Sequence, residues 1–158
     1  MKHTQEFLAL EPYLKQIRHA HYLSSLLYFD LATACPEEAI ESQSELINEQ
    51  DAEAAKIFSS PDFISKVEAL TNLPSISKEE KRLADSLSFN ITLLKKMPLE
   101  EYLKARKAFS KSNEMWRKFK ETNQFSEWLP YWKECIAYAR KIDKLMMKEG
   151  MESPYDSA

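Results

Sequence analysis

Apolar residues recur at three- and four-residue steps through most of the chain, a spacing typical of amphipathic helices. The longest stripe predicts a first helix from about Gln5 to Thr33, with Pro12 kinking its early part or marking its effective start, and Pro36 ending it. A second helix is expected over Glu37–Phe58. The remaining stripes predict a short helix and three long ones, at about Ser60–Thr71, Ser77–Lys96, Leu99–Thr122 and Phe125–Glu149.

The expected helix ends carry recognisable signals. Ser77 with Glu80 three residues later forms a capping-box pattern, and Gly150 lies where a glycine commonly ends a helix. The connections between the expected helices are short, so consecutive long helices should pack antiparallel to one another.

The composition supports this reading. Gly150 is the single glycine and Val67 the only valine, so the tight hairpins, phosphate-binding loops and β-branched strands that rely on these residues are not expected. The fold class is therefore predicted as all-α. We expect one domain over 1–158, a bundle of about five long antiparallel helices plus one short helix.

Charge and hydropathy exclude several classes of partner. The net charge of −3 and the pI near 5.7 arise from interspersed acids and bases, without the basic stripe that nucleic acid requires. There is no apolar run of about 18 residues, so no membrane association is expected. Without a leader pattern and with only two cysteines, the chain is predicted to be cytoplasmic.

Histidines and cysteines give weak signals for chemistry. His19 and His21 are two residues apart, which points their rings to different sides of a helix, and two zinc ligands on one helix need spacings of three or four. His21 is expected as a hydrogen-bonded core residue. Cys35 follows a helix C-terminus, whose negative field disfavours a thiolate, so an inert buried thiol is favoured. Cys135 is expected to pack in a helix interface, and the charged run 78–82 to form a solvated face.

A set of aromatic residues on the fourth and fifth long helices can be interpreted in two ways. Because the residues follow helical spacing, we favour the interpretation that they form the core between those helices. The alternative is a platform on which a ligand stacks. Its members are Trp116, Phe119, Phe125, Trp128, Tyr131 and Trp132.

The corner between the first two helices is harder to interpret. Asp30 and Thr33 lie one turn apart and share a face, and Pro36 follows them. Apolar neighbours suggest a buried acid, which would be costly without a partner. Either Thr33 and the backbone near Pro36 satisfy Asp30 and fix the corner, or these residues line a groove.

This corner also carries a family resemblance. The run Tyr28-Phe29-Asp30-x-x-Thr33-x-x-Pro36 resembles the Trp-Asp-x-x-Thr-x-Met-Pro signature of the carboxypeptidase Taq family of zinc metallocarboxypeptidases, related in fold to oligoendopeptidase F. Phe29 stands where that family usually has Trp. Further matching segments follow in the same order as in the family: Trp116-x-x-x-Lys120-x-x-Asn123-Gln124-Phe125, Pro130-Tyr131 and Ser153-Pro154-Tyr155-Asp156.

The resemblance implies a role without catalysis. The family's zinc is held by a His-Glu-x-x-His helix, whose glutamate is the general base. These 158 residues contain no such motif, so no catalytic or metal residue is assigned and no cofactor is expected in this chain. The resemblance implies an N-terminal region forming one wall and lid of the substrate groove, with zinc, the catalytic region and the peptide substrate belonging to the parent enzyme.

The competing hypothesis is a free-standing helical bundle that acts as a binding or assembly module. An apolar patch left exposed could bind a partner, and a homodimer is left open. An independent peptidase is disfavoured, because neither zinc ligands nor a general base are present.

Overall fold

The computed structural model describes residues 3–153, and within that range every regular element is a helix. The prediction of an all-α chain with five long helices and one short helix is confirmed. The elements are α1 (Gln5–Thr33), the 3₁₀ turn η1 (Glu37–Ala39), α2 (Ile40–Phe58), α3 (Pro61–Thr71), α4 (Lys78–Lys96), α5 (Leu99–Glu121) and α6 (Phe125–Met146).

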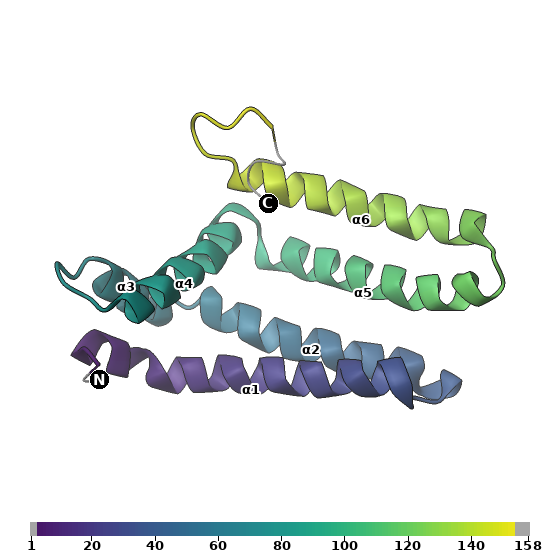
Figure 1. Ribbon diagram of the computed structural model, residues 1–158, viewed down its shortest axis with the longest axis horizontal. Helices are drawn as coiled ribbons and strands as arrows, with labels where there is room; N and C mark the ends of the chain where they lie inside the picture. The colour runs from purple at the N-terminus through teal and green to yellow at the C-terminus, as the bar shows by residue number, and fades with distance from the viewer. Residues whose placement is uncertain (1–2, 154–158) are drawn as a thin grey trace.

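Four of the five long helices form an open layer. Helices α1, α2, α5 and α6 lie side by side in this order, each antiparallel to its neighbour, while α3 and α4 pack at one end of the layer (Figure 1). Because α1 packs against α2 and α3 but not against α6, the layer does not close into a cylinder. The faces of the layer that α3 and α4 do not cover are therefore left without a second layer of helices.

Two helix ends differ from the sequence prediction. Residues 37–39 form a 3₁₀ turn, and α2 begins only at Ile40. At the other end of the chain α6 stops at Met146, so Gly150 is not its cap; it lies in the following loop with φ of +90°. The turn from α5 to α6 instead uses Asn123, whose φ of +54° is a conformation that asparagine tolerates better than most residues.

The main core lies where α3 and α4 meet α1 and α2. Phe63 is fully buried there and packs edge-on against Phe58, with ring centroids 5.6 Å apart. The stripe predicted for the first helix supplies the other side, and Pro12 lies inside α1 without ending it. Buried members of this core are Leu10, Leu14, Ile17, Phe58, Phe63, Val67, Leu70, Ala84, Leu87 and Ile91.

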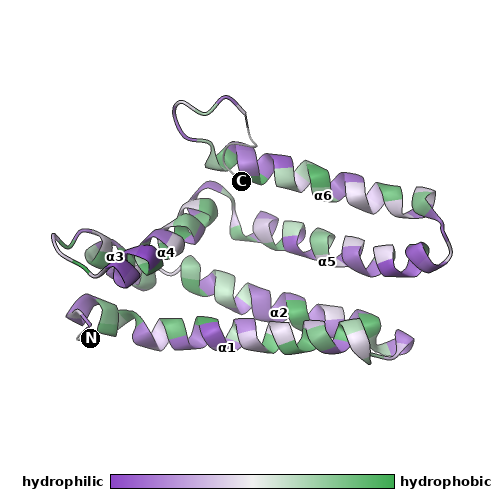
Figure 2. Cartoon of the chain, viewed as in Figure 1, coloured by the Kyte–Doolittle hydropathy of each residue, from purple (hydrophilic) through white to green (hydrophobic). Residues whose placement is uncertain are grey.

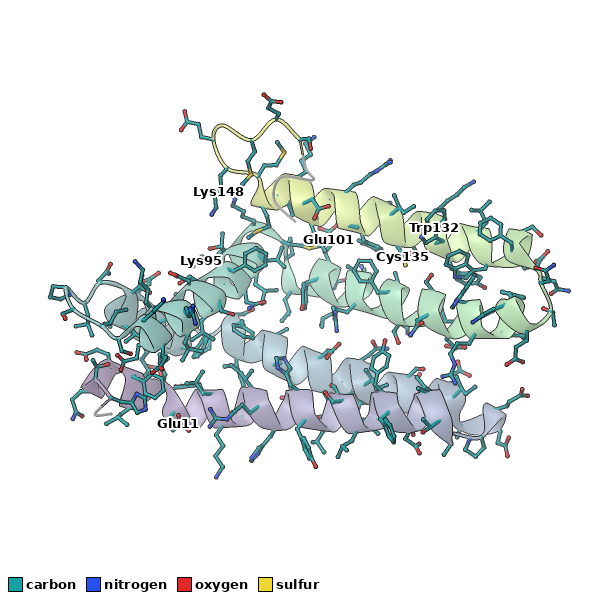
Figure 3. The ribbon with its side chains drawn as sticks, viewed as in Figure 1. Glu11, Lys95, Glu101, Trp132, Cys135 and Lys148 are labelled. Atoms are coloured by element: carbon teal, nitrogen blue, oxygen red, sulfur yellow. The ribbon has the colours of Figure 1, made fainter. Side chains whose placement is uncertain are left out.

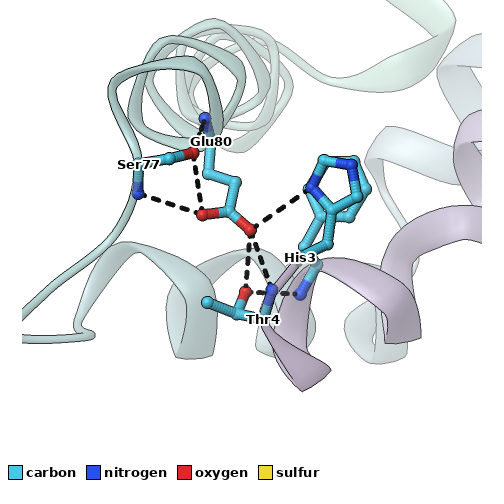
Figure 4. Close-up of polar contacts among 5 residues, drawn as sticks. His3, Thr4, Ser77 and Glu80 are labelled. Atoms are coloured by element: carbon cyan, nitrogen blue, oxygen red, sulfur yellow. Dashed lines mark hydrogen bonds and ion pairs between the residues drawn. The ribbon is translucent and has the colours of Figure 1, made fainter. Parts of the chain in front are cut away.

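Glu80 joins the starts of two helices beside this core. Its carboxylate accepts hydrogen bonds from the N–H and hydroxyl of Ser77, the N-cap of α4, and from the N–H and hydroxyl of Thr4, the N-cap of α1 (Figure 4). The predicted capping box is confirmed. The expectation that the whole run 78–82 is solvated is wrong for Glu80, which is 3 % exposed, because both caps converge on its carboxylate.

The second core, between α4, α5 and α6, is small. Its buried members are Leu93, Met97, Ala105 and Met146, and Met146 is the only buried residue of α6. Figure 2 shows hydrophobic and hydrophilic positions alternating along α5 and α6. Several large apolar residues of this pair remain exposed. The prediction that the aromatic set forms a core there is wrong in part: Trp116, Phe125 and Trp132 are 38 %, 52 % and 43 % exposed, because no other helix of the described chain covers that part of the α5–α6 pair.

Candidate functional site

The corner after α1 is held by side chains from α2. Gln43 donates from Nε2 to the Asp30 carboxylate at 2.7 Å and to the Leu27 carbonyl at 3.3 Å. The Thr33 hydroxyl donates to the Phe29 carbonyl at 2.7 Å. Asp30 and Thr33 therefore do not bond to each other, and each has its own partner.

The last carbonyl groups of a helix lack hydrogen-bond donors within the helix. At the end of α1, the donors come from the residues that follow the helix and from α5. The Asp30 carbonyl accepts from the N–H groups of Ala34 and Cys35, and Arg117 of α5 donates to the Leu31 carbonyl. The latter contact ties α5 to the end of α1 across the layer. Pro36 then takes an extended conformation, with ψ of 149°, and leads into η1.

The three predicted candidates Asp30, Thr33 and Pro36 are thus brought to one corner, but all are exposed. The expectation of a buried acid is wrong, because Phe29 beside it points outward and is 69 % exposed. The sequence did not reveal Gln43 as the partner of Asp30.

A second polar cluster lies in a hollow of about 190 Å³ between α1, α2, α4 and α5. Arg106 of α5 donates from Nε (3.0 Å) and Nη2 to one oxygen of Asp51 of α2, whose other oxygen lies 3.4 Å from the Ser24 hydroxyl of α1. Asp51 is 13 % exposed. His21, Asn90 and Tyr102 also line this hollow.

Burial and charge set the ionisation of this cluster. Burial would lower the pKa of Arg106, but the hydrogen bonds and charge of Asp51 outweigh it, and the pKa is raised. Burial raises the pKa of Tyr102, whose hydroxyl therefore stays protonated. The cluster is an arginine–carboxylate pair with a neutral phenol beside it, suited to holding three helices together and to presenting polar groups on one face.

Sequence reasoning missed this pair. The stripe of α2 runs through Ile47, Ala54 and Phe58, and Asp51 occupies the position between them where an apolar residue is expected. An acid at a stripe position signals a buried partner of opposite charge. Nothing local in the sequence indicates that the partner is Arg106, 55 residues further on.

The described residues contain no group of three histidine, cysteine or acidic side chains able to hold a metal ion. His19 and His21 line different hollows of the layer, as their spacing predicted. The expectation of a core histidine at His21 is wrong, since its ring is exposed at the edge of the hollow. Cys35 and Cys135 are free thiols, each half-buried; Cys35 is thus less buried than expected.

The aromatic residues of α5 and α6 line a shallow hollow of about 330 Å³. Trp128 is central: its indole N–H donates to the Ser112 carbonyl at 2.9 Å, and its ring centroid lies 4.7 Å from that of Trp116 and 5.5 Å from that of Trp132. Cys135 lies between the two helices, with its sulfur 3.5 Å from the Ala108 carbonyl (Figure 3).

This helical architecture is shared with a metallocarboxypeptidase. The structure of Pyrococcus furiosus carboxypeptidase in its Apo-Mg form matches with a TM-score of 0.74 and 22 % sequence identity, over 99 % of this chain and 31 % of that chain. The chain belongs to the carboxypeptidase Taq (M32) metallopeptidase family, whose model matches residues 9–158.

A similar protein of known name supports the same family assignment. Thermostable carboxypeptidase 1 of Pyrococcus furiosus is 24 % identical over 136 residues, which are 86 % of this chain and 27 % of the relative. The chain thus spans less than a third of the length of the carboxypeptidases it matches. The resemblance seen at the corner is confirmed as family membership; its segment at 154–156 lies outside the described residues. No helix in the described part is long and apolar enough to cross a membrane.

Proposed function

We propose that this chain is the N-terminal, groove-forming region of a metallocarboxypeptidase of the M32 family and is not catalytic on its own. The observation that carries the proposal is the coverage of the structural match. It takes in 99 % of this chain but 31 % of the carboxypeptidase, so the chain corresponds to one part of a larger enzyme fold.

The chemistry of the side chains supports the non-catalytic role. Peptide hydrolysis by a zinc enzyme needs three protein ligands around an open metal site and a general base. The described residues do not fit a zinc ion, because they bring no three suitable side chains together. We assign zinc to the remainder of the parent enzyme.

The polar hollow supports a role as a groove wall. Asp51 of α2 and Arg106 and Tyr102 of α5 line this hollow together with residues of α1 and α4, and a peptide in the parent enzyme would run across it. The corner residues Asp30, Thr33 and Pro36 act further along, by fixing where α1 ends and α2 begins. Their bonds to Gln43 and to backbone carbonyls favour shaping of the wall over contact with substrate.

The proposal is tested by two measurements on the isolated chain. Elemental analysis after incubation with zinc and exhaustive dialysis should find less than stoichiometric metal. A peptide with a free C-terminus should not be hydrolysed. Stoichiometric zinc together with hydrolysis would overturn the non-catalytic role. In a complementary experiment, an M32 polypeptide that lacks the equivalent region is added to the isolated chain. Hydrolysis of the peptide should then appear.

A free-standing binding or assembly module, including a homodimer, is the second candidate. The exposed aromatic residues Trp116, Phe125 and Trp132 favour it, since exposed apolar clusters commonly mark interaction surfaces. Sedimentation of the isolated chain discriminates: a stable dimer supports this candidate. For either function we propose a cytoplasmic location, consistent with two free cysteines.

A further inference from the structure

Helix α6 carries two apolar stripes but has a neighbour for only one of them. Trp128, Cys135 and Ile142 face α5 or pack with it. A second stripe follows the i, i+4, i+7, i+11 spacing of a single helix face, on the side next to the first. Its members are Phe125, Leu129, Trp132 and Ile136, all exposed or half-buried.

The N-terminal half of α6 has no other helix to pack against. Its contact with α4 lies at the opposite end, where Met146 joins the small core and Lys96 donates to the Leu145 carbonyl. We define the aromatic face as three groups of residues. They are the uncovered stripe of α6 (Phe125, Leu129, Trp132 and Ile136), Trp128 beside it on the same helix, and the neighbouring Phe109 and Trp116 of α5.

The surface area of the chain indicates that a large face is uncovered. The chain exposes 10615 Å², whereas a compact monomer of 18.5 kDa exposes roughly 8200 Å². The excess is about 2400 Å². A stable interface of standard size takes about 800 Å² from each partner, so the excess is sufficient for an obligate interface.

Charges beside the aromatic face restrict what can cover it. Lys133, Arg140 and Lys144 recur along the adjoining edge of α6, and within the described chain none of them has a carboxylate partner. A complementary partner therefore presents apolar side chains at its centre and carboxylates at this rim.

A second copy of the chain fits this pattern poorly. A two-fold symmetric contact through the aromatic face would place the same surface of both copies together, and the basic edge of one α6 would lie beside that of the other. Like charges brought together in this way oppose association.

We propose that the aromatic face of α5 and α6 is the surface on which the remainder of the carboxypeptidase fold docks, through an apolar surface edged by carboxylates. This inference rests on the proposed function, which makes the chain one part of a larger enzyme. The inference specifies which face of this chain contacts the remainder of that enzyme. Trp132 is the central anchor, because exposed tryptophans at the middle of an apolar patch contribute most to such interfaces.

The test measures binding of the chain to Pyrococcus furiosus carboxypeptidase from which the matched segment has been deleted. Isothermal titration gives the Kd for the wild-type chain and two variants. Trp132→Glu places a charge at the centre of the aromatic face. Phe89→Glu is the matched control, an equally exposed aromatic residue on α4, away from that face. Thermal melting confirms that both variants are folded.

We expect binding by the wild-type chain and by Phe89→Glu, and a Kd at least about 10-fold weaker for Trp132→Glu. Lys133→Glu should weaken binding about 2- to 5-fold and reduce its dependence on salt. Binding that Trp132→Glu leaves unchanged would overturn the aromatic face as the docking surface while leaving the proposed function intact. No binding by the wild-type chain would count against both, and a dimer dissociated by Trp132→Glu would assign the face to a second copy.

Discussion

Thr4 and Glu80, 76 residues apart, are joined by two hydrogen bonds, from the Thr4 N–H at 3.0 Å and from its hydroxyl at 3.1 Å to the same carboxylate oxygen. The other oxygen of Glu80 serves Ser77. One carboxylate thus completes the N-termini of α1 and α4, two helices with a positive partial charge at that end.

Stability should therefore fall in mild acid. Hydrogen bonds from the backbone N–H groups of Thr4 and Ser77 hold the pKa of Glu80 at about 2, below its ordinary value of 4.5. A lowered pKa contributes stability that is complete above pH 4.5 and is lost as the pH falls from there toward 2. Circular-dichroism melts should show the melting temperature decreasing across this window.

Glu80→Gln should lower the melting temperature at pH 7 by several degrees and flatten its decline below pH 4.5. The exposed neighbour Glu79 is the matched control, and Glu79→Gln should retain the wild-type profile. Equal pH profiles for wild type and Glu80→Gln would contradict the assignment. Thr4→Ala should cost about 1 kcal/mol, the usual value of an N-cap.

The Asp51–Arg106 pair should be thermodynamically coupled. Asp51→Asn leaves the Arg106 charge without its partner in a partly buried site and should lower the free energy of unfolding by about 1–2 kcal/mol. Urea denaturation of Asp51→Asn, Arg106→Gln and the double variant gives the coupling. Strictly additive effects would show that the pair contributes nothing as a pair.

At the corner we expect Gln43 to matter more than Asp30. Gln43→Ala removes donors from both the Asp30 carboxylate and the Leu27 carbonyl and should cost about 1 kcal/mol. Asp30→Asn should cost less than about 0.5 kcal/mol, because the site is exposed and a carboxylate near a helix C-terminus is unfavourable. A larger loss for Asp30→Asn in urea denaturation would restore the view of Asp30 as a buried acid.

Two aromatic residues should differ sharply in their contribution to stability. Phe63→Ala leaves a cavity in the main core and should cost about 3–5 kcal/mol. Trp132→Ala should cost less than about 1 kcal/mol in the isolated chain, since one side of its ring meets solvent. Denaturant midpoints measure both, and similar losses would mean that the aromatic face is covered in solution.

Periodicity and prolines were sufficient to predict the helices, because each amphipathic stripe and each break is a local property of the chain. The capping box at Ser77 was predictable for the same reason. Thr4 as a second partner of Glu80, and Arg106 as the partner of Asp51, were not, since both pairs depend on how distant helices meet.

The aromatic stripe of α6 shows a different limit. Helical spacing at Trp128 and Trp132 shows that a face is apolar, but it cannot show whether another helix covers that face. The family signature at Asp30 identified the relatives correctly, while the exposure of Phe29 beside it depends on the open layer and was not predictable from the pattern.

The unequal cores give the two ends of the molecule different local stabilities. Amide hydrogens of α3, α4 and the first half of α1 lie around the main core and should exchange with solvent slowly, close to the rate set by global unfolding. Amides near the α5–α6 turn at Asn123 have few buried side chains around them and should exchange by local opening. The end of the α5–α6 pair at this turn should thus open locally while the main core stays folded.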